Sequence, residues 1–318
     1  MPICQRPLFT VVMPCYQAGS TVAVAIASVL AQSEGNFELI VVDDGSVDDS
    51  ATLATAAIGI DRRGRVLRGH NLGAAAARNR GAQAGTGRII AFLDADDRWT
   101  VDFLREHANA FSHDPSLGLS FSRVRFYDCQ LLIAGRVSAG RGQLSFADAL
   151  AENPLCSTSN MSVRRHVFEE LRGFDETLRH AEDQEFVVRI LATTQWKVAG
   201  LNAELVHYRM SKNGLSADLT SMERGWYAML ECARSYTAPS SFGPAERRAK
   251  ALHARYLARR ALRTGQSPFR AFVHLWSALR IDCRALLGAE LNRTLLVVAG
   301  TVAVMLLPQR LIHHIVSR

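Results

Sequence analysis

The sequence predicts an α/β protein, with a mostly parallel sheet flanked by helices and a basic, partly apolar helical tail. Short apolar runs alternate with helix-like segments through the first third of the chain, and two of these runs end abruptly in carboxylates. Such alternation is typical of a parallel sheet with helices on both faces. The third observation is a step in charge. The segment Ala245–Arg318 holds 13 Lys and Arg against 3 Asp and Glu, so it carries +10 of a whole-chain charge of +7 and leaves −3 for the rest.

The expected elements of the sheet follow one another closely. In chain order they are strand Leu8–Met13, a helix capped by Ser20 or Thr21 that ends near Ala31, strand Phe37–Val42, helix Val47–Ala57, strand Arg65–Arg68, an Ala-rich helix entered at Gly73, and strand Ile89–Leu93. Helix Val101–Phe111 follows, and Leu117–Tyr127 starts further strands. The apolar runs have the length of strands that are buried on both faces.

Carboxylates follow two of these strands directly. Asp94, Asp96 and Asp97 come after Ile89–Leu93, and Asp44 comes after Phe37–Val42. Ligands of open parallel sheets bind at the carboxyl ends of the strands, so we expect these side chains at the mouth of a crevice. Carboxylate oxygens suit Mg²⁺ or Mn²⁺, which usually complete their shells with water and substrate phosphates. An ordinary solvated turn before a helix is the alternative.

The cysteines and the N-terminus favour a cytoplasmic protein. The six cysteines are far apart, without a CxxC pair or zinc-like spacing, and are interpreted as reduced thiols. No secretory signal is recognised in Met1–Pro7. A basic segment that adjoins an apolar run indicates an anionic membrane surface before nucleic acid, so no nucleic-acid partner is expected.

The tail is expected to contain two amphipathic helices, separated by a break at Gly265–Pro268. Either they pack on the preceding domain or their basic faces lie on lipid headgroups. The uncharged run Thr294–Leu307 would span about 21 Å as a helix, against about 30 Å of hydrocarbon. An interfacial anchor is therefore favoured over a membrane span, and the protein is expected to be peripheral on the inner face of the plasma membrane.

Four motifs occur in order over Leu8–Asp97. They are Val12–Gly19, Val41–Asp48, Asn71–Gly81 and Leu93–Asp97. In this order and spacing the chain resembles glycosyltransferase family 2, the inverting sugar transferases of the GT-A fold. The resemblance implies a nucleotide-sugar donor, most often a uridine diphosphate sugar. It also implies a catalytic domain over residues 1–244, divided into a nucleotide-sugar-binding half, 1–113, and an acceptor-binding half, 114–244, with the tail at 245–318.

The same resemblance implies roles for residues of the four motifs. Pro14 and Asp44 would lie near the base and ribose, Arg78 near the base, and Tyr16 among the nucleotide-sugar-binding residues.

Asp94 and Asp96 would form the Asp-x-Asp pair of the family, with Asp96 as the first ligand of Mn²⁺ or Mg²⁺. Negative charge builds on the β-phosphate as a sugar leaves a nucleoside diphosphate, and a metal ion that bridges the phosphates stabilises that charge.

Two further stretches resemble acceptor-side motifs of the family. Gly173–Glu176 matches a Gly-Phe-Asp-Glu motif, and Glu182 and Asp183 match a Glu-Asp pair. The resemblance makes Asp183 the catalytic base, while Glu182 orients or helps bind the acceptor. The alternative is that both carboxylates only stabilise the N-terminus of the helix that they begin.

His207 is a further candidate metal ligand or phosphate contact. Related enzymes often carry a histidine where this chain has Ser211, and His207 lies close by in sequence. A lone histidine at a strand end is, however, more often structural. The Gln-x-x-Arg-Trp signature of processive synthases is also missing, because Arg224-Gly225-Trp226 does not match it. One sugar per binding event is therefore expected.

These observations predict an inverting, metal-dependent, non-processive glycosyltransferase that acts on a hydroxyl of a glycan or lipid-linked acceptor. The alternative is a catalytically inactive protein that binds nucleotide sugars as a scaffold at the membrane. A nucleotidyltransferase is disfavoured, because Pro14–Gln17 is not a Gly-rich, Lys-bearing phosphate loop.

Overall fold

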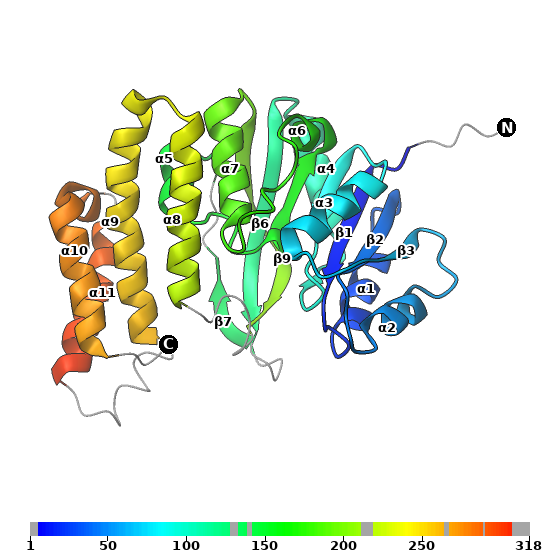
Figure 1. Cartoon of the computed structure of the whole chain (residues 1–318), viewed down its shortest axis with the longest axis horizontal. Coiled ribbons are helices and arrows are strands. Elements are labelled where there is room, and N and C mark those ends of the chain that lie inside the picture. Colours follow the sequence, from blue (N-terminus) through cyan, green and yellow to red (C-terminus); the bar gives the residue numbers. More distant parts are fainter. Residues whose placement is uncertain are drawn as a thin grey trace. The chain divides into compact units, whose positions relative to one another are not determined.

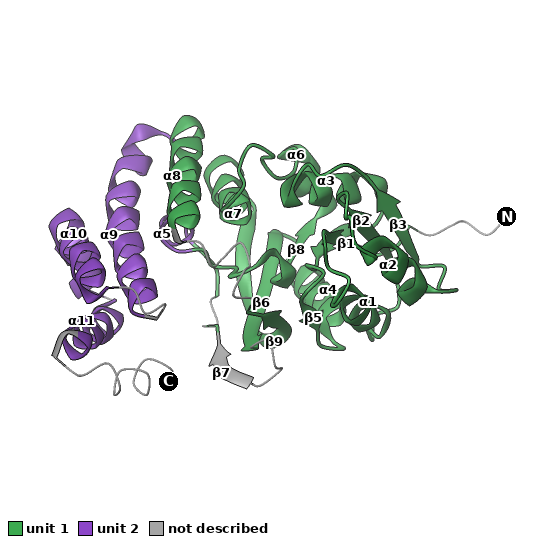
Figure 2. Ribbon diagram, turned by 60° about the horizontal axis from the view of Figure 1, so that its bottom comes forward, with its two compact units in different colours: residues 1–144, 153–236 green, residues 145–152, 237–318 purple. Residues whose placement is uncertain are grey.

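The computed structural model describes residues 6–127, 133–138, 142–210, 219–263, 267–288 and 290–306. The chain forms two compact units (Figure 2). The first takes residues 1–144 and 153–236, and the second takes residues 145–152 and 237–318.

The first unit begins with four parallel strands, in the spatial order β3-β2-β1-β4 (Figure 1). The strands are β1 (Phe9–Cys15), β2 (Phe37–Asp43), β3 (Gly64–Arg68) and β4 (Ile89–Phe92), and the helices between them are α1 (Val22–Leu30), α2 (Ser50–Ile58) and α3 (Ala74–Ala84). The α/β prediction is confirmed, with element ends that differ from the expected ones by a few residues.

Strand β2 shows why the run of apolar residues is continuous. Leu39 and Val41 belong to the large core cluster that includes residues of α1 and α2, whereas Ile40 and Val42 pack with Ala77 of α3. Successive side chains of a strand point to opposite faces, so both faces of this strand are covered by helices.

The small residues of α3 bring this helix close to the sheet. A Cβ atom on Gly81 would lie 2.4 Å from Cγ1 of Val12 in β1, so a larger residue here would force the helix outward. The motif Asn71–Gly81 is therefore explained in part by packing.

The remainder of the sheet is mixed, in contrast to the parallel first part. β8 (Met161–Arg164) runs antiparallel between β4 and β6 (Leu117–Tyr127), and β9 (Lys197–Arg209) pairs in parallel with β6. The short strand β5 (Arg98–Trp99) is antiparallel to β9, and β7 (Ile133–Val137) is antiparallel to β6. The other helices of this unit are α4 (Phe103–His113), α6 (Arg165–Glu170), α7 (Glu182–Thr193) and α8 (Leu219–Tyr236), and a single 3₁₀ turn spans Thr158–Asn160.

The second unit is helical. It contains α5 (Phe146–Ala151), α9 (Pro239–Arg263), α10 (Pro268–Leu287) and α11 (Leu291–Leu306). The break expected at Gly265–Pro268 separates α9 from α10. The boundary expected between residues 244 and 245 falls inside α9, however, since this helix starts at Pro239 and continues through Pro244.

An arginine holds the second unit together. The Arg255 side chain is buried and donates to Glu152, at 2.8 Å, and to Glu290, at 2.9 Å. Glu152 follows α5 and Glu290 precedes α11, so one guanidinium connects three segments.

No helix in the described part of the chain is long and apolar enough to cross a membrane.

One buried histidine makes the stability of the first unit sensitive to acid. His107 of α4 is fully buried, its Nδ1 lies 2.5 Å from Oγ of Ser120, and burial lowers its pKa to about 3. The unfolded chain takes up a proton here below about pH 6.5, and the folded chain does not. This contribution to stability is therefore lost as the pH falls from about 6.5 towards 3, at a rate of up to about 1.4 kcal/mol per pH unit.

We expect His107→Gln to flatten this acid dependence, because the amide does not titrate. The measurement is urea unfolding at several pH values between about 4 and 7. His113→Gln, at the exposed end of the same helix, is the matched control and should keep the wild-type slope. An unchanged slope in His107→Gln would show that this imidazole is not the group responsible.

Candidate active site

The carboxyl ends of β1, β2 and β4 lie at one edge of the sheet, because these strands are parallel neighbours. Asp44 follows β2, and Asp94, Asp96 and Asp97 follow β4. The structure therefore brings the strand-end carboxylates to the expected edge, although they serve different purposes there.

Asp44 shapes the entry to α3. Its Oδ1 accepts a hydrogen bond from the amide of Leu72, at 3.0 Å, and its Oδ2 accepts one from Gly73, at 2.8 Å. Gly73 has φ +101°, a conformation that favours glycine. Both oxygens of this buried carboxylate thus bind the backbone, and the predicted contact with a nucleoside stays a prediction.

Tyr16 and Pro14 lie beside this turn. The amide of Asp44 donates to the carbonyl of Cys15, at 2.8 Å, which places the end of β1 against the start of the Asp44 loop. The Tyr16 side chain is about half exposed, and its hydroxyl accepts from Nε2 of Gln17 at 3.1 Å. An exposed aromatic ring at this edge is available to a flat ligand such as a base.

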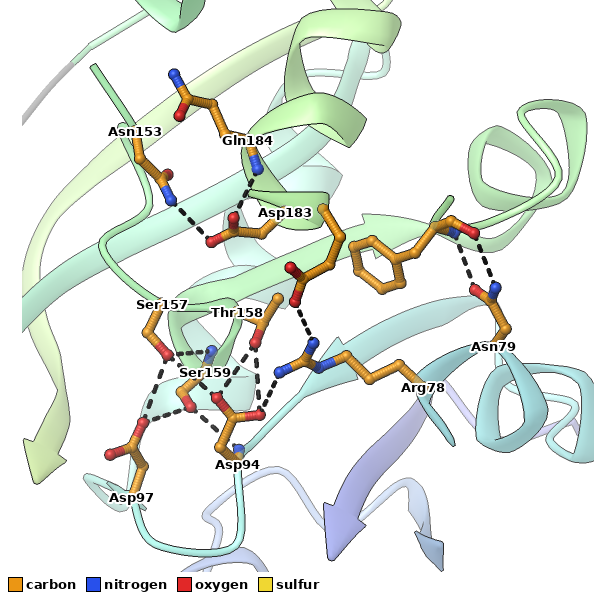
Figure 3. Close-up of polar contacts among 12 residues, drawn as sticks. Arg78, Asn79, Asp94, Asp97, Asn153, Ser157, Thr158, Ser159, Asp183 and Gln184 are labelled. Carbon is orange, nitrogen blue, oxygen red and sulfur yellow. Dashed lines mark hydrogen bonds and ion pairs between the residues drawn. The ribbon is translucent and has the colours of Figure 1, made fainter. Parts of the chain in front are cut away.

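Arg78 connects the two halves of the site (Figure 3). Its Nη2 donates to Oδ1 of Asp94, at 2.7 Å, and its Nη1 donates to Oε1 of Glu182, at 2.8 Å. Burial works to lower the pKa of Arg78, but the Asp94 and Glu182 carboxylates outweigh it and raise the pKa above its ordinary value. The double ion pair was not predicted from the sequence, and contact between Arg78 and a nucleobase stays a prediction.

A row of hydroxyls supports the strand end after β4. Oγ of Ser159 donates to Oδ2 of Asp97, at 2.5 Å, and accepts from the amide of Asp94, at 3.0 Å. Oγ1 of Thr158 lies 3.3 Å from Oδ2 of Asp94 (Figure 3). The hydroxyls of Thr158 and Ser159 therefore bind the loop Asp94–Asp97 and fix its position at the end of β4.

Asp97 does not stand at the mouth of the site, as the sequence suggested. Only 1% of its surface is exposed, and its Oδ1 accepts from the amide of Arg209, at 2.9 Å. Burial, followed by the charges of Asp96 and Asp94, raises its pKa well above the ordinary value. Asp97 therefore joins the loop to β9 and is not free to bind a ligand.

Asp96 is the exposed carboxylate of the three. The side chain reaches solvent, but the protein around it partly shields the carboxylate from water. This loss of hydration, followed by the charge of Asp94, raises the pKa of Asp96 to about 6. Within the described ranges it makes no hydrogen bond or ion pair with another side chain. A carboxylate that lacks a partner and is repelled by its neighbour fits a divalent cation, which would relieve the repulsion.

His207 is not brought into a common ligand set with these aspartates. It lies on β9 opposite Arg98, with its ring 4.8 Å from that of Tyr127. Burial, followed by the charge of Arg98, lowers its pKa. The described residues contain no group of three or more carboxylate, imidazole or thiolate side chains that could hold one ion. Ser211 lies outside the described residues.

Asp183 lies in the first turn of α7, next to Glu182. Its Oδ2 accepts from Nδ2 of Asn153, at 2.9 Å, and its Oδ1 accepts from the amide of Gln184, at 2.7 Å (Figure 3). Burial raises its pKa, while these two hydrogen bonds lower it. The carboxylate is thus oriented by two donors and more basic than usual, which suits a proton acceptor.

Asn153 was missed by the sequence analysis. It follows a short helix in a stretch that carries no recognised motif, so the only signal was its polar character. Its contact with Asp183 is made across 30 positions of the chain.

The Gly173–Glu176 motif docks on α3 through Asn79. Nδ2 of Asn79 donates to the carbonyl of Phe174, and its Oδ1 accepts from the amide of Phe174, both at 2.9 Å. Gly173 has φ +74°, and a Cβ atom there would lie 2.4 Å from Oδ1 of Asn79. This motif therefore fixes the segment before α7 against the helix that carries Arg78.

Glu182 completes the cluster. Its pKa is raised to about 6, chiefly by burial and with a further rise from Asp183, although Arg78 opposes the rise. The charge of Asp94 also raises the pKa of Asp183. The carboxylates after β4 and those at the start of α7 therefore interact electrostatically around Arg78. Asp96 is the exposed carboxylate after β4, and Asp183 is the oriented carboxylate of α7.

Comparison with known proteins gives one consistent result. The model of the family described as "Glycosyl transferase family 2" matches residues 10–172. The chain is 27% identical over 231 residues to the putative teichuronic acid biosynthesis glycosyltransferase TuaG of Bacillus subtilis, which covers 72% of this chain and 90% of TuaG.

A second relative has a more specific name. The chain is 38% identical over 224 residues to the UDP-Glc:alpha-D-GlcNAc-diphosphoundecaprenol beta-1,3-glucosyltransferase WfgD of Escherichia coli, which covers 69% of this chain and 84% of WfgD. Among solved structures, the mannosyltransferase PcManGT from Pyrobaculum calidifontis, in complex with GDP-Man and Mn²⁺, superposes with a TM-score of 0.62 at 18% identity. That match covers 95% of this chain and 81% of PcManGT and shows a shared fold.

We expect Arg78→Met to cost about 3 kcal/mol of unfolding free energy, because it leaves Asp94 and Glu182 without their counter-charge in a mostly buried position. The loss should shrink at lower pH, where protonation of Glu182 removes its charge. Chemical denaturation at two pH values measures both effects.

Arg80→Met is the matched control on the same helix. Arg80 is exposed and donates to the carbonyl of Arg68, so its loss should cost less than about 1 kcal/mol. If the two variants are equally stable, Arg78 does not organise the cluster.

Proposed function

Because the chain belongs to glycosyltransferase family 2, we propose that it transfers one sugar, with inversion, from a nucleoside diphosphate donor to a hydroxyl of its acceptor. Structures of the GT-A type are its neighbours, in agreement with the fold expected from the sequence. The observation that carries the proposal is the cluster of Asp94, Arg78, Glu182 and Asp183, in which β4, α3 and α7 meet.

The proposed reaction needs two functions from this cluster. The acceptor oxygen forms a bond to the anomeric carbon while the bond from that carbon to the β-phosphate oxygen breaks, and the hydroxyl proton goes to a base. Asp183 is oriented by Asn153 and the amide of Gln184, and its pKa is raised, so we assign the base to Asp183. Glu182 is tied to Arg78 and helps place the acceptor.

The donor side is assigned to the opposite carboxylates. Asp96, with Asp94 beside it, would hold Mn²⁺ or Mg²⁺, since its carboxylate is exposed and no other side chain of the described residues binds it. When bound, the ion would neutralise the charge that develops on the leaving diphosphate. The presence of Mn²⁺ in the complex of PcManGT supports this choice. Tyr16, Pro14, Asp44 and Arg78 are proposed to line the nucleoside part.

The names of the relatives support a narrower proposal for the substrates. WfgD is named for a UDP-Glc donor and a diphosphoundecaprenol-linked acceptor. We propose a UDP-sugar donor and a glycan or lipid-linked acceptor for this chain. A lipid-linked acceptor lies at a membrane, so the enzyme would act at a membrane surface, on its cytoplasmic side.

The metal assignment predicts that Asp96→Asn weakens UDP binding about tenfold or more in the presence of Mn²⁺, which corresponds to about 1.4 kcal/mol. Little change is expected with a chelator present, because Asp96 would act through the ion. Calorimetric titration with UDP under both conditions provides the measurement.

Asp102→Asn is the control for this experiment. Asp102 lies at the start of α4 and accepts from Ser33, so its loss removes one carboxylate without touching the strand end after β4. Equal UDP affinity of the wild type with and without Mn²⁺ would remove the assignment of Asp96.

The assignment of the base predicts that Asp183→Asn lowers the transfer rate by a factor of about 10² to 10⁴, the usual contribution of a positioned general base. Donor affinity should stay close to that of the wild type, because the amide keeps the size of the carboxylate. Transfer assays and UDP-sugar titrations on the same preparation test this.

Glu185→Gln separates this effect from a loss of helix stability. Glu185 lies in the same first turn of α7, is buried, and pairs with Arg189 at 2.9 Å. It should lower the melting temperature and leave the chemical step nearly intact. If Asp183→Asn is destabilised but still active, Asp183 is not the catalytic base. If the wild-type chain binds UDP-sugars but transfers sugar to no hydroxyl, a scaffold protein is favoured over an enzyme.

A further inference from the structure

Helix α10 uses one of its faces to build the second unit. Ala271, Leu275, Ala278 and Leu286 are buried, and the spacing of the first three is that of one helix face. Ala271 and Leu275 form a cluster with two alanines of α9 and with Val297 of α11. The inward side of α10 is therefore fully used.

The opposite side of α10 is also apolar. Phe269, Phe272, Val273 and Trp276 are 66%, 45%, 47% and 55% exposed, and their spacing of three, four and seven places them on one stripe. We call these four residues the α10 face (the helix is labelled in Figure 1). A surface helix normally carries polar residues opposite its buried side, so a contiguous aromatic stripe in that place indicates a binding surface.

The charges near the α10 face are mainly positive. Arg280 is exposed further along the same side of the helix, and Arg270 is exposed near its start. Arg284 is exposed as well, beyond the non-helical backbone at Asp282. Asp282 is the only acidic residue of α10. In the described part of the chain no acidic side chain pairs with Arg280 or Arg284. Two copies that met through this side would bring like charges together, whereas anionic lipid headgroups would complement them.

We propose that the α10 face lies in the headgroup region of an anionic bilayer, with the aromatic rings at the boundary of the acyl chains and the arginines on the lipid phosphates. This inference deepens the proposed function, since it names the surface through which the enzyme would reach a lipid-linked acceptor. It relocates the anchor that the sequence suggested at Thr294–Leu307.

Helix α11, which contains the described part of that run, fits the role less well. Thr294, Val297 and Thr301 are buried, and its exposed residues Leu295, Leu296 and Val302 include no aromatic side chain. Arg293 at its start is paired with Glu152 and Glu290 and is not available to lipid phosphates in the same way.

The test is sedimentation of the full chain with vesicles of phosphatidylcholine alone or with added phosphatidylglycerol. We expect binding to the anionic vesicles only, and weaker binding at high salt. Phe272→Ser/Trp276→Ser should lower the partition coefficient at least tenfold. Arg280→Gln/Arg284→Gln should lower it severalfold and reduce the dependence on salt. Trp276→Phe keeps an aromatic ring and should bind like the wild type.

Ile60→Ser/Val101→Ser is the matched control. These two side chains of the first unit are 101% and 53% exposed, so the control removes exposed apolar surface elsewhere and should not affect binding. Circular dichroism and UDP titration on every variant show that the fold is retained, and the arginine pair tests the surface without removing apolar groups.

Three results would overturn the inference. They are a wild type that ignores anionic vesicles, a Phe272→Ser/Trp276→Ser variant that binds as well as the wild type, and a concentration-dependent dimer that this variant abolishes, which would make a second copy the occupant. Vesicle binding without UDP-sugar binding would refute the proposed catalysis and leave the inference standing. UDP-sugar binding and transfer to a soluble acceptor without vesicle binding would support the proposed catalysis and refute the inference about the α10 face.

Discussion

The candidate site depends on the neutralisation of buried carboxylates by one arginine. Asp94, Glu182 and Asp183 lie close enough for their charges to act on one another, and burial raises the pKa of both residues of α7. Like charges in a region of low dielectric repel strongly, so a cluster of this kind is tolerated only around a cation. Arg78 supplies that charge. Through its two ion pairs it also connects α3, which carries it, to the loop after β4 and to the first turn of α7.

Several motif residues of the family have structural tasks in this chain. Asp44 holds the amides of Leu72 and Gly73, and Asn79 binds the Gly-Phe-Asp-Glu segment through three hydrogen bonds, two of them to the backbone of Phe174 and one to Glu176. The spacing of the motifs thus reflects how loops are tied to helix α3 as well as what a substrate requires. A change at either residue would move Arg78 indirectly, because both act on the helix that carries it.

The parallel part of the fold and the sheet edge at which the strand-end carboxylates gather were predictable from the sequence, whereas the contacts that these side chains make were not. The continuous apolar run of β2 indicates that both faces of the strand are buried, and carboxylates that directly follow strands indicate a shared edge of the sheet. Periodicity does not say which element covers a face, however. The partners of Arg78 lie 16 and 104 positions away, and Asn153 lies in a stretch without a motif. Asp97 was expected beside Asp96, but it is buried because Ser159 and the amide of Arg209 bind it, and no local pattern predicts those contacts. The tail likewise showed its helical character, and α11 contains the described part of the apolar run considered as a helix, but the packing of α5 with the tail was not predicted.

The placement of α5 has a consequence for the order in which parts of the protein fold during synthesis. Residues 145–152 belong to the second unit, although both flanking segments belong to the first. Ala149, Leu150 and Ala151 are buried, Asp148 pairs with Arg248, and Glu152 pairs with Arg255. During synthesis these residues leave the ribosome well before α9 exists, whereas domains generally begin to fold from the N-terminus as they emerge. The segment directly preceding Asn153 therefore finds its native packing only once α9 has been made. Shortened chains that end at Tyr236 would leave α5 with an uncovered apolar side, and the helical unit is not a module that can be removed at a single cut.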